Sequence, residues 1–145
     1  NFKGAFKIEE LITKKIKFNT IVSIEVIEHL DDNALNDYIE SIKLLLSENG
    51  KFIISTPNDE DLNENMIYCP STGEIFHRWQ HVRSWSGEVL NKYLKSHNMK
   101  SIDTFSTDFK QKSMSIGNIK SIIKRILRKQ NKKPHLVVIG KQMRG

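Results

Sequence analysis

Two carboxylates and an imidazole lie close together near the start of the chain. Glu25, Glu28 and His29 follow the pattern E-x-x-E-H. Such side chains converge on one point if the backbone turns helically after Glu25. Two carboxylate ligands and a histidine suit Mg²⁺ or Mn²⁺ and also tolerate Zn²⁺. The pattern makes these residues candidate metal ligands; the alternative is that Glu28 and His29 only flank or cap the next helix and that Glu25 is solvated.

The elements on either side place this pattern at a junction between a strand and a helix. Residues 18–24 are a β-branched, apolar run that predicts a buried strand. A helix is predicted to have Asp31 or Asp32 as its N-cap and to end at Asn49-Gly50, where glycine can take the left-handed cap conformation. Its apolar face is expected to contain Leu35, Ile39, Ile42, Leu45 and Leu46.

Strands and helices continue to alternate further along the chain. Residues 51–58 predict a second strand, which Pro57 stops. Ser86 is expected to cap a helix that carries apolar residues from Val89 to Leu94 and ends near Asn98. Further expected elements are a short helix or a loop within residues 1–17, a strand at 99–107 and a last buried strand at 134–140.

Two segments differ from this alternation. Residues 59–85 show no clear periodicity and predict a long polar loop, a kind of segment that is usually functional or mobile. Residues 116–133 predict a basic amphipathic insertion helix. Its basic face could contact an RNA backbone or a membrane surface. The simpler interpretation is that its apolar stripe packs on the sheet and its basic face is solvated.

The order of these elements predicts an α/β domain whose first strands are parallel. In such sheets, ligands bind outside the carboxyl ends of the strands. The E-x-x-E-H pattern lies at one such end, and the sequence STPN at residues 55–58 lies at the next. We therefore expect the functional site at this end of the sheet.

Composition sets outer limits on function. The chain has 145 residues, of which 38% are hydrophobic, a single cysteine and a formal net charge of +6. This is about one domain with enough apolar residues for a packed core and without an intrachain disulfide. No signal-peptide pattern and no apolar run long enough to span a bilayer occur, so we expect a soluble, cytoplasmic protein.

The first two strands carry a resemblance to a known family. FNTIVSIEVIEHL and GKFIISTPN, one helix apart, resemble the fourth and fifth strands of class I S-adenosylmethionine-dependent methyltransferases. The resemblance covers roughly residues 1–107, and residues 134–140 match the terminal strand of that fold. It implies a partial Rossmann-like sheet with flanking helices and S-adenosylmethionine as the cofactor.

The chain departs from this family in two respects. The glycine-rich loop after the family's first strand and the acidic residue that holds the ribose are absent, and no G-x-G occurs. We therefore expect a C-terminal part of the domain, with the N-terminal strands missing, that is inactive and binds the cofactor weakly by itself. The resemblance leaves Ile24, Glu25 and Val26 as cofactor contacts, with Ala5 and Phe6 as weaker candidates near the adenine.

A second segment extends the resemblance to metal-dependent enzymes. EIFHRWQHVRSW, at residues 74–85, follows the T-P-N sequence as in the small-RNA 3′-terminal 2′-O-methyltransferases, where two glutamates and two histidines hold a divalent metal. The matching positions here are Glu25, Glu28, His29 and His81. The E-x-x-E-H turn also resembles the ubiquinone-pathway O-methyltransferases, which are metal-dependent too.

Both resemblances imply methylation of one oxygen in a pair of neighbouring oxygens. A divalent ion chelated by such a pair orients the oxygens and lowers the hydroxyl pKa. His81 or His77 could then accept the proton. Alternatively, Cys69 could join both histidines in a structural zinc site, but Thr72 stands where the second thiol of a C-x-x-C pair would be needed.

These features together predict an S-adenosylmethionine-dependent methyltransferase that methylates a hydroxyl of a small molecule or glycan, with or without Mg²⁺ or another divalent metal. A quinone precursor and an RNA 3′ end are alternative acceptors, and a non-catalytic binding or scaffold module is the alternative class. Without the family's first strand, residues 20–24 have an unpaired apolar edge, which predicts a homodimer of the fragment.

Overall fold

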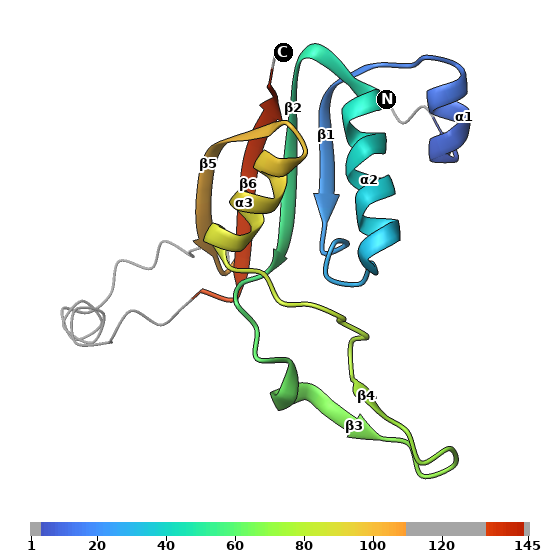
Figure 1. The fold of residues 1–145 in the computed structure, drawn as a ribbon, viewed down its shortest axis with the longest axis vertical. Helices are drawn as coiled ribbons and strands as arrows, with labels where there is room; N and C mark the ends of the chain where they lie inside the picture. The colour runs from blue at the N-terminus through green and yellow to red at the C-terminus, as the bar shows by residue number, and fades with distance from the viewer. Residues whose placement is uncertain (1–3, 110–132, 144–145) are drawn as a thin grey trace, which may run out of the picture.

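A computed structural model describes residues 4–109 and 133–143 of the chain. They form a four-stranded sheet with helices and a separate two-stranded hairpin (Figure 1). The basic helix predicted at about 116–133 lies almost wholly outside the described residues. Within them, no helix is both long enough and apolar enough to cross a membrane.

The sheet has the strand order β1-β2-β6-β5. β1 (Phe18–Ile24) runs parallel to β2 (Leu46–Pro57), as the sequence predicts. β6 (His135–Gln142) runs antiparallel to both of its neighbours, β2 and β5 (Met99–Thr107). The carboxyl ends of β1 and β2 therefore meet the amino end of β6 at one end of the sheet.

Helices cover one face of this sheet. α2 (Asp32–Leu45) connects β1 to β2, α1 (Ile8–Thr13) contacts α2, and α3 (Gly87–Ser96) packs on β5 and β6 (Figure 1). The hydroxyl of Tyr93 in α3 donates to Asn36 Oδ1 in α2 at 2.8 Å, so the two helices are neighbours. The core between the helices and the sheet includes Leu35, Ile39, Phe52, Ile54, Leu90, Leu94, Met99, Leu136 and Val138.

The opposite face of the sheet carries no helix among the described residues. Val22, Ile53 and Ile139 occupy one row of paired positions, and Ile24 and Phe105 belong to the row beside it. Val22 is 55% exposed and Ile24 is 64% exposed. This face is therefore apolar and open near β1.

The helix after β1 ends earlier than the sequence predicts. α2 ends at Leu45, because Leu46 already has extended backbone and begins β2. Gly50 lies inside β2 without a positive φ, so the predicted glycine cap at Asn49-Gly50 is wrong. A Cβ at Gly50 would lie 2.9 Å from the carbonyl oxygen of Phe18, which indicates that glycine allows β1 and β2 to approach there.

Both predicted N-caps are confirmed. The side chain of Asp31 accepts from the Ala34 N–H at 2.8 Å, and Ser86 Oγ accepts from the Val89 N–H at 3.2 Å. These bonds satisfy backbone donors that a helix start leaves free. Val89 itself is exposed, and the buried residues of α3 are Leu90 and Leu94. All five residues predicted for the apolar face of the preceding helix are buried, namely Leu35, Ile39, Ile42, Leu45 and Leu46.

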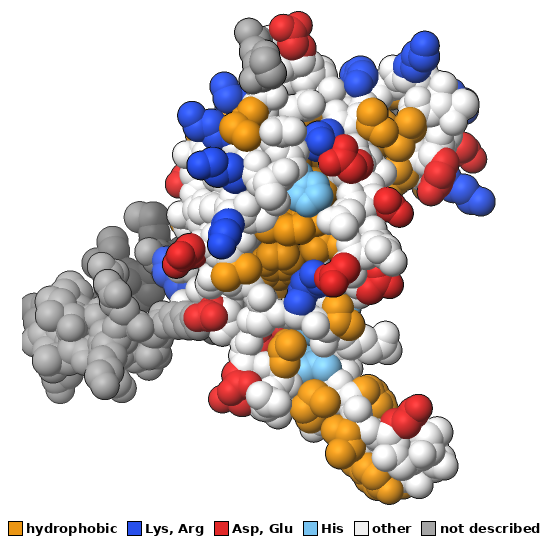
Figure 2. All heavy atoms as spheres, in the orientation of Figure 1, with side chains coloured by type: hydrophobic (Ala, Val, Ile, Leu, Met, Phe, Trp, Pro, Cys, Tyr) orange, Lys and Arg blue, Asp and Glu red, His pale blue; other side chains and the backbone are white. Residues whose placement is uncertain are grey.

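The segment 59–85 is more ordered than predicted. It contains a short 3₁₀ helix, η1 (Leu62–Asn65), and a hairpin of β3 (Met66–Tyr68) and β4 (Ile75–His77). The hairpin extends as an arm beyond the end of the sheet (Figure 1). Hydrophobic side chains follow this arm (Figure 2), and its exposed members are Met66, Tyr68, Ile75 and Phe76. The prediction of a continuous irregular loop is therefore wrong here.

Candidate functional site

The E-x-x-E-H segment turns sharply at the carboxyl end of β1. Glu25 has a left-handed backbone, with φ of 51°. The chain then makes a turn that the N–H of His29 closes by donating to the Val26 carbonyl at 3.1 Å. Ile27 is fully buried and anchors this turn in the core. The turn therefore presents Glu28 and His29 at the end of the sheet.

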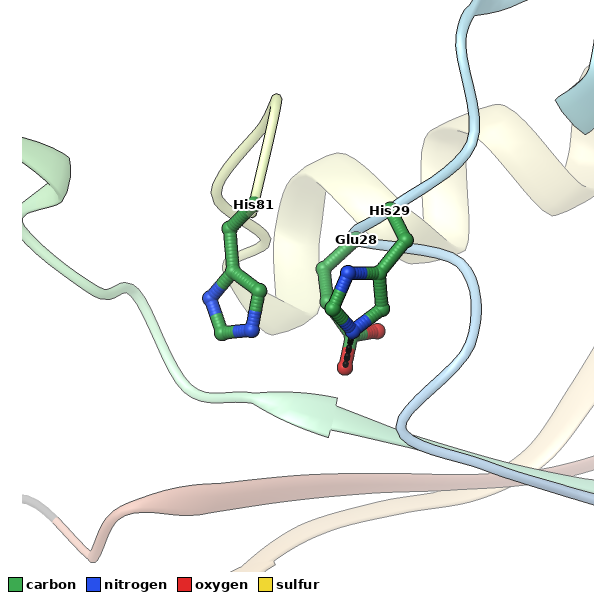
Figure 3. Close-up of side chains that lie close together, drawn as sticks. All are labelled: Glu28, His29 and His81. Atoms are coloured by element: carbon green, nitrogen blue, oxygen red, sulfur yellow. Dashed lines mark ion pairs between the residues drawn. The ribbon is translucent and has the colours of Figure 1, made fainter. Parts of the chain in front are cut away.

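A backbone hydrogen bond brings the distant segment 81–82 against this turn. The N–H of Val82 donates to the Glu28 carbonyl at 2.9 Å. His81 consequently lies beside Glu28 and His29 (Figure 3), and one possible ligand atom from each of the three lies within 4.8 Å of the others. The rings of His29 and His81 meet edge to face, with 4.8 Å between centroids. Three of the four residues proposed as metal ligands from sequence are thus neighbours.

Glu28 is the most unusual member of this cluster. Its side chain is 1% exposed, although it carries a carboxyl group. Thr56 donates to Oε2 at 3.0 Å, whereas Oε1 is buried without a hydrogen-bond partner among the described residues. Nε2 of His29 lies 3.9 Å from Oε1, too far for a hydrogen bond. Burial raises the pKa of Glu28, since a carboxylate loses hydration here. A cation beside Oε1 would offset that cost.

The carboxylate of Glu25 interacts with Ser55 and His135 and not with the cluster of Glu28, His29 and His81. Its Oε1 accepts from Ser55 Oγ at 2.8 Å, and its Oε2 lies 3.4 Å from His135 Nδ1 at the start of β6. It belongs to neither group of possible metal ligands among the described residues. The structure therefore separates Glu25 from the three residues with which the sequence groups it, and pairs it with His135, which sequence reasoning missed.

A second glutamate that sequence reasoning missed contacts His81. Glu60 Oε2 lies 2.5 Å from His81 Nδ1, and Glu60 Oε1 lies 3.6 Å from His77 Nε2. The rings of His77 and His81 are stacked, with 4.7 Å between centroids. His77 is 5% exposed and does not line the cavity described in the next paragraph. This position does not suit it to accept a proton from a substrate.

A cavity of about 610 Å³ lies at this end of the sheet. That volume is within the usual range for small-molecule sites. Trp79 of the arm forms part of the wall. Six carboxylates and three histidines line the cavity, and no Lys or Arg does so among the described residues. These nine residues are Glu25, Glu28, Asp59, Glu60, Asp61, Glu64, His29, His81 and His135.

The other residues predicted as cofactor contacts do not line this cavity. Ala5 and Phe6 are exposed and precede α1, and Ile24 and Val26 flank Glu25 without entering the lining. Of the five predicted contacts, Glu25 alone faces the cavity.

The structural zinc site considered from sequence does not assemble among the described residues. Cys69 lies in the turn of the arm, where its Sγ is 3.1 Å from Ser71 Oγ. It belongs to neither cluster of possible metal ligands, whereas His77 and His81 share one with Glu60. Cys69 and the two histidines are therefore not placed as ligands of one ion.

Solved structures share this fold. A 1,6-didemethyltoxoflavin-N1-methyltransferase from Burkholderia thailandensis aligns at a TM-score of 0.57 and 14% identity, covering 90% of this chain and 46% of that one. S-adenosylmethionine-dependent methyltransferases from Archaeoglobus fulgidus (0.57, 13% identity, 94% of this chain and 66% of that one) and Clostridium acetobutylicum (0.56, 14%, 89% and 60%) align similarly. The chain thus spans about half to two thirds of the length of these structures.

The sequence comparisons agree with this fold. No curated protein matches the chain. A family model described as a methyltransferase domain matches residues 1–104, which is more than two thirds of the 145 residues. That range includes β1, the E-x-x-E-H turn, α2, β2, the arm and α3. With its α/β sheet and the cavity at the carboxyl ends of β1 and β2, the chain belongs to this methyltransferase domain family.

Proposed function

We propose that this chain is part of an S-adenosylmethionine-dependent O-methyltransferase that acts at the cavity with the help of a divalent metal. Glu28, His29 and His81 would hold the metal. The observation that carries this proposal is the buried Glu28 carboxylate, whose Oε1 has no hydrogen-bond partner among the described residues while two imidazoles stand beside it. An uncompensated buried carboxylate is costly, and metal coordination is one of the usual ways in which proteins satisfy it.

The donor set fits a hard or borderline divalent ion. One carboxylate and two imidazoles suit Mn²⁺ and Zn²⁺ and are acceptable for Mg²⁺. Three protein ligands leave coordination positions open, as catalytic metal sites require. When bound, such an ion lowers the pKa of a coordinated hydroxyl group and orients it.

Family membership supports S-adenosylmethionine as the methyl donor. The Burkholderia structure is a complex with S-adenosylhomocysteine. In this chain, Ile24, Glu25 and Val26 at the carboxyl end of β1 remain the predicted cofactor contacts. Weak cofactor binding by this chain alone also stays a prediction.

The cavity favours a small neutral acceptor such as a polyol, glycan or catechol. Its size suits a small molecule, and its carboxylates would repel the phosphates of an RNA end. His135 also faces the cavity and belongs to neither metal cluster among the described residues, while its ring is 3.4 Å from Glu25. We assign His135 as the base that accepts the hydroxyl proton, because it lines the cavity and is not a proposed metal ligand.

Calorimetry with Mn²⁺ tests the metal site. The chain should bind Mn²⁺, and Glu28→Gln and His81→Ala should each weaken this binding at least about tenfold. Glu28→Gln keeps the side-chain shape and an oxygen for the Thr56 hydroxyl, and it removes a poorly solvated charge, so it should melt no lower than the wild type. Glu74→Gln, a charge-matched change on the arm outside the cavity, should bind Mn²⁺ normally.

A second titration tests the acceptor class. Catechol has two neighbouring hydroxyls and should bind the wild type only in the presence of Mn²⁺. Resorcinol, whose hydroxyls are not adjacent, should not bind even when Mn²⁺ is present. Equal Mn²⁺ affinity in the wild type, Glu28→Gln and His81→Ala would refute the metal site. Catechol binding that is the same with and without Mn²⁺ would refute metal-assisted binding of the diol.

A further inference from the structure

We propose that Glu60 is a positioning residue that fixes the tautomer of His81, so that Nε2 of His81 presents its lone pair to Glu28 and His29. The consequence for metal or proton binding rests on the function proposed above. The tautomer itself is a property of the described residues and needs no bound ion.

The contact between Glu60 and His81 decides where the imidazole proton lies. Glu60 Oε2 is 2.5 Å from His81 Nδ1. An ionised carboxylate can only accept, so Nδ1 must carry the hydrogen. A neutral imidazole has one N–H, and Nε2 of His81 is then left with a lone pair. In Figure 3, one ring nitrogen of His81 lies on the side of Glu28 and His29, and the other points away from them.

His77 has the opposite tautomer, and its other ring nitrogen faces Glu60. The backbone N–H of His81 donates to His77 Nδ1 at 3.2 Å, so that nitrogen must have the lone pair. Nε2 of neutral His77 therefore carries the hydrogen and faces Glu60 Oε1 at 3.6 Å. A protonated nitrogen cannot bind a metal. We accordingly interpret Glu60 and His77 as residues that hold His81 in place, and not as ligands of a second metal site.

The surroundings hold this arrangement in place. Asn65 donates its side-chain N–H to Glu60 Oε1 at 3.3 Å, which fixes the carboxylate from a second direction. The side chains of His77, His81 and Glu60 are 4%, 9% and 16% exposed, so water competes little for their hydrogen bonds. The ring of His81 is also packed between the rings of His77 and His29. Orientation and tautomer are thus set together, as for a metal-binding histidine that donates its other nitrogen to a carboxylate.

Nitrogen-15 NMR of histidine-labelled chain reads the tautomer directly. Spectra would be recorded without metal at about pH 8.5, two units above the ordinary histidine pKa, so that imidazoles are neutral. His81 in the wild type should be protonated on Nδ1. In Glu60→Ala the acceptor is gone, and a substantial fraction should shift to the Nε2–H form. Glu74→Ala, on the same arm but outside the cavity, should leave the spectrum of His81 unchanged.

Mn²⁺ affinity gives the second readout. Glu60→Ala should weaken Mn²⁺ binding by about 10- to 100-fold although Glu60 is not a proposed ligand, and Glu74→Ala should not. An Nε2–H tautomer of His81 in the wild type would overturn the proposal even if Glu60→Ala does not fold. An unchanged tautomer in folded Glu60→Ala would also overturn it. Failure of the wild type to bind Mn²⁺ would refute the metal site proposed above but leave the tautomer assignment standing.

Discussion

Two glutamate–histidine pairs flank the buried carboxylate of Glu28. Glu60 contacts His81, Glu25 lies near His135, and all four residues line the cavity. In our proposals, Glu60 fixes the tautomer of His81, whereas Glu25 lies 3.4 Å from Nδ1 of His135, which is not a metal ligand. The histidines can therefore have different tasks, with His81 as a ligand and His135 as a base.

Cys69 has an unusual environment that predicts its reactivity. Hydrogen bonds from the side chains of Ser71 and Thr72, followed by backbone N–H groups, lower the pKa of Cys69 to about 6. Because these donors favour the thiolate, the reactive form should dominate at neutral pH. Alkylation of the folded chain by iodoacetamide should rise through about pH 6 and level off by about pH 7.5.

The matched controls separate this environment from simple exposure. Ser71→Ala removes the hydroxyl that lowers the Cys69 pKa most, so the alkylation profile of this variant should move toward higher pH. The chain unfolded in urea should titrate near the ordinary cysteine value, about 8.5. A folded wild type whose profile coincides with that of the unfolded chain would contradict the assignment.

The sequence predicts part of the site and misses the rest for a physical reason. Glu28 and His29 share one turn, and their local spacing alone indicates that they lie together. Glu60 lies among several acidic residues without periodicity, so its contact with His81 is set by the path of the arm. His135 reaches the cavity because β6 is antiparallel to β2. The direction of a strand in a sheet cannot be predicted from a single apolar run of sequence. The sequence signal that could have indicated His135 as a site residue is its position at the start of the last predicted strand.

At the scale of elements, the close approach of β2, β6 and β5 depends on Gly140. Gly140 is paired with Phe52 in β2 and with Ser101 in β5. A Cβ at this position would lie 2.3 Å from Phe52 Cζ and 2.5 Å from the Lys100 carbonyl oxygen. The contact with the Lys100 carbonyl oxygen cannot be relieved by a side-chain rotation, so a strand would have to move as well as the fully buried Phe52.

We therefore expect Gly140→Ala to destabilise the chain by about 3 kcal/mol, at the upper end of the usual cost of overpacking a core. Urea unfolding followed by circular dichroism measures this directly. Lys141→Ala, at the exposed neighbouring position, should change stability by less than about 0.5 kcal/mol. Equal unfolding midpoints for the two variants would show that β6 and β5 are less tightly packed than described.

Strand positions were easier to predict than the end of the first long helix. The bounds of β1 and β5 agree with the sequence prediction, since both are apolar runs between clear breaks. The pair Asn49-Gly50 is typical of a helix end, but here it lies within β2. Tertiary pairing with β1 overrides that local signal, because the register of β2 begins at Leu46 opposite Phe18.

At the scale of the whole molecule, β1 has a partner on one side only within the described residues. Its outward-facing side chains Val22 and Ile24 belong to the open apolar face. An unpaired strand edge offers backbone hydrogen-bonding groups to another chain, and an exposed apolar face adds a driving force. No proline or lysine within residues 20–24 blocks such pairing.

We therefore expect the chain to self-associate through β1, most simply as a two-fold dimer in which the two β1 edges pair. Ile24→Lys places a charge in the apolar face beside this edge, where burial against a second copy would be costly. Multi-angle light scattering should report a dimer for the wild type and a monomer for Ile24→Lys. The matched control is Ile102→Lys, because Ile102 is similarly exposed, at 53%, but lies in β5 at the other edge of the sheet. This control should remain dimeric. A monomeric wild type at high concentration, or a dimer that Ile102→Lys disrupts and Ile24→Lys does not, would show that the β1 edge is not the contact.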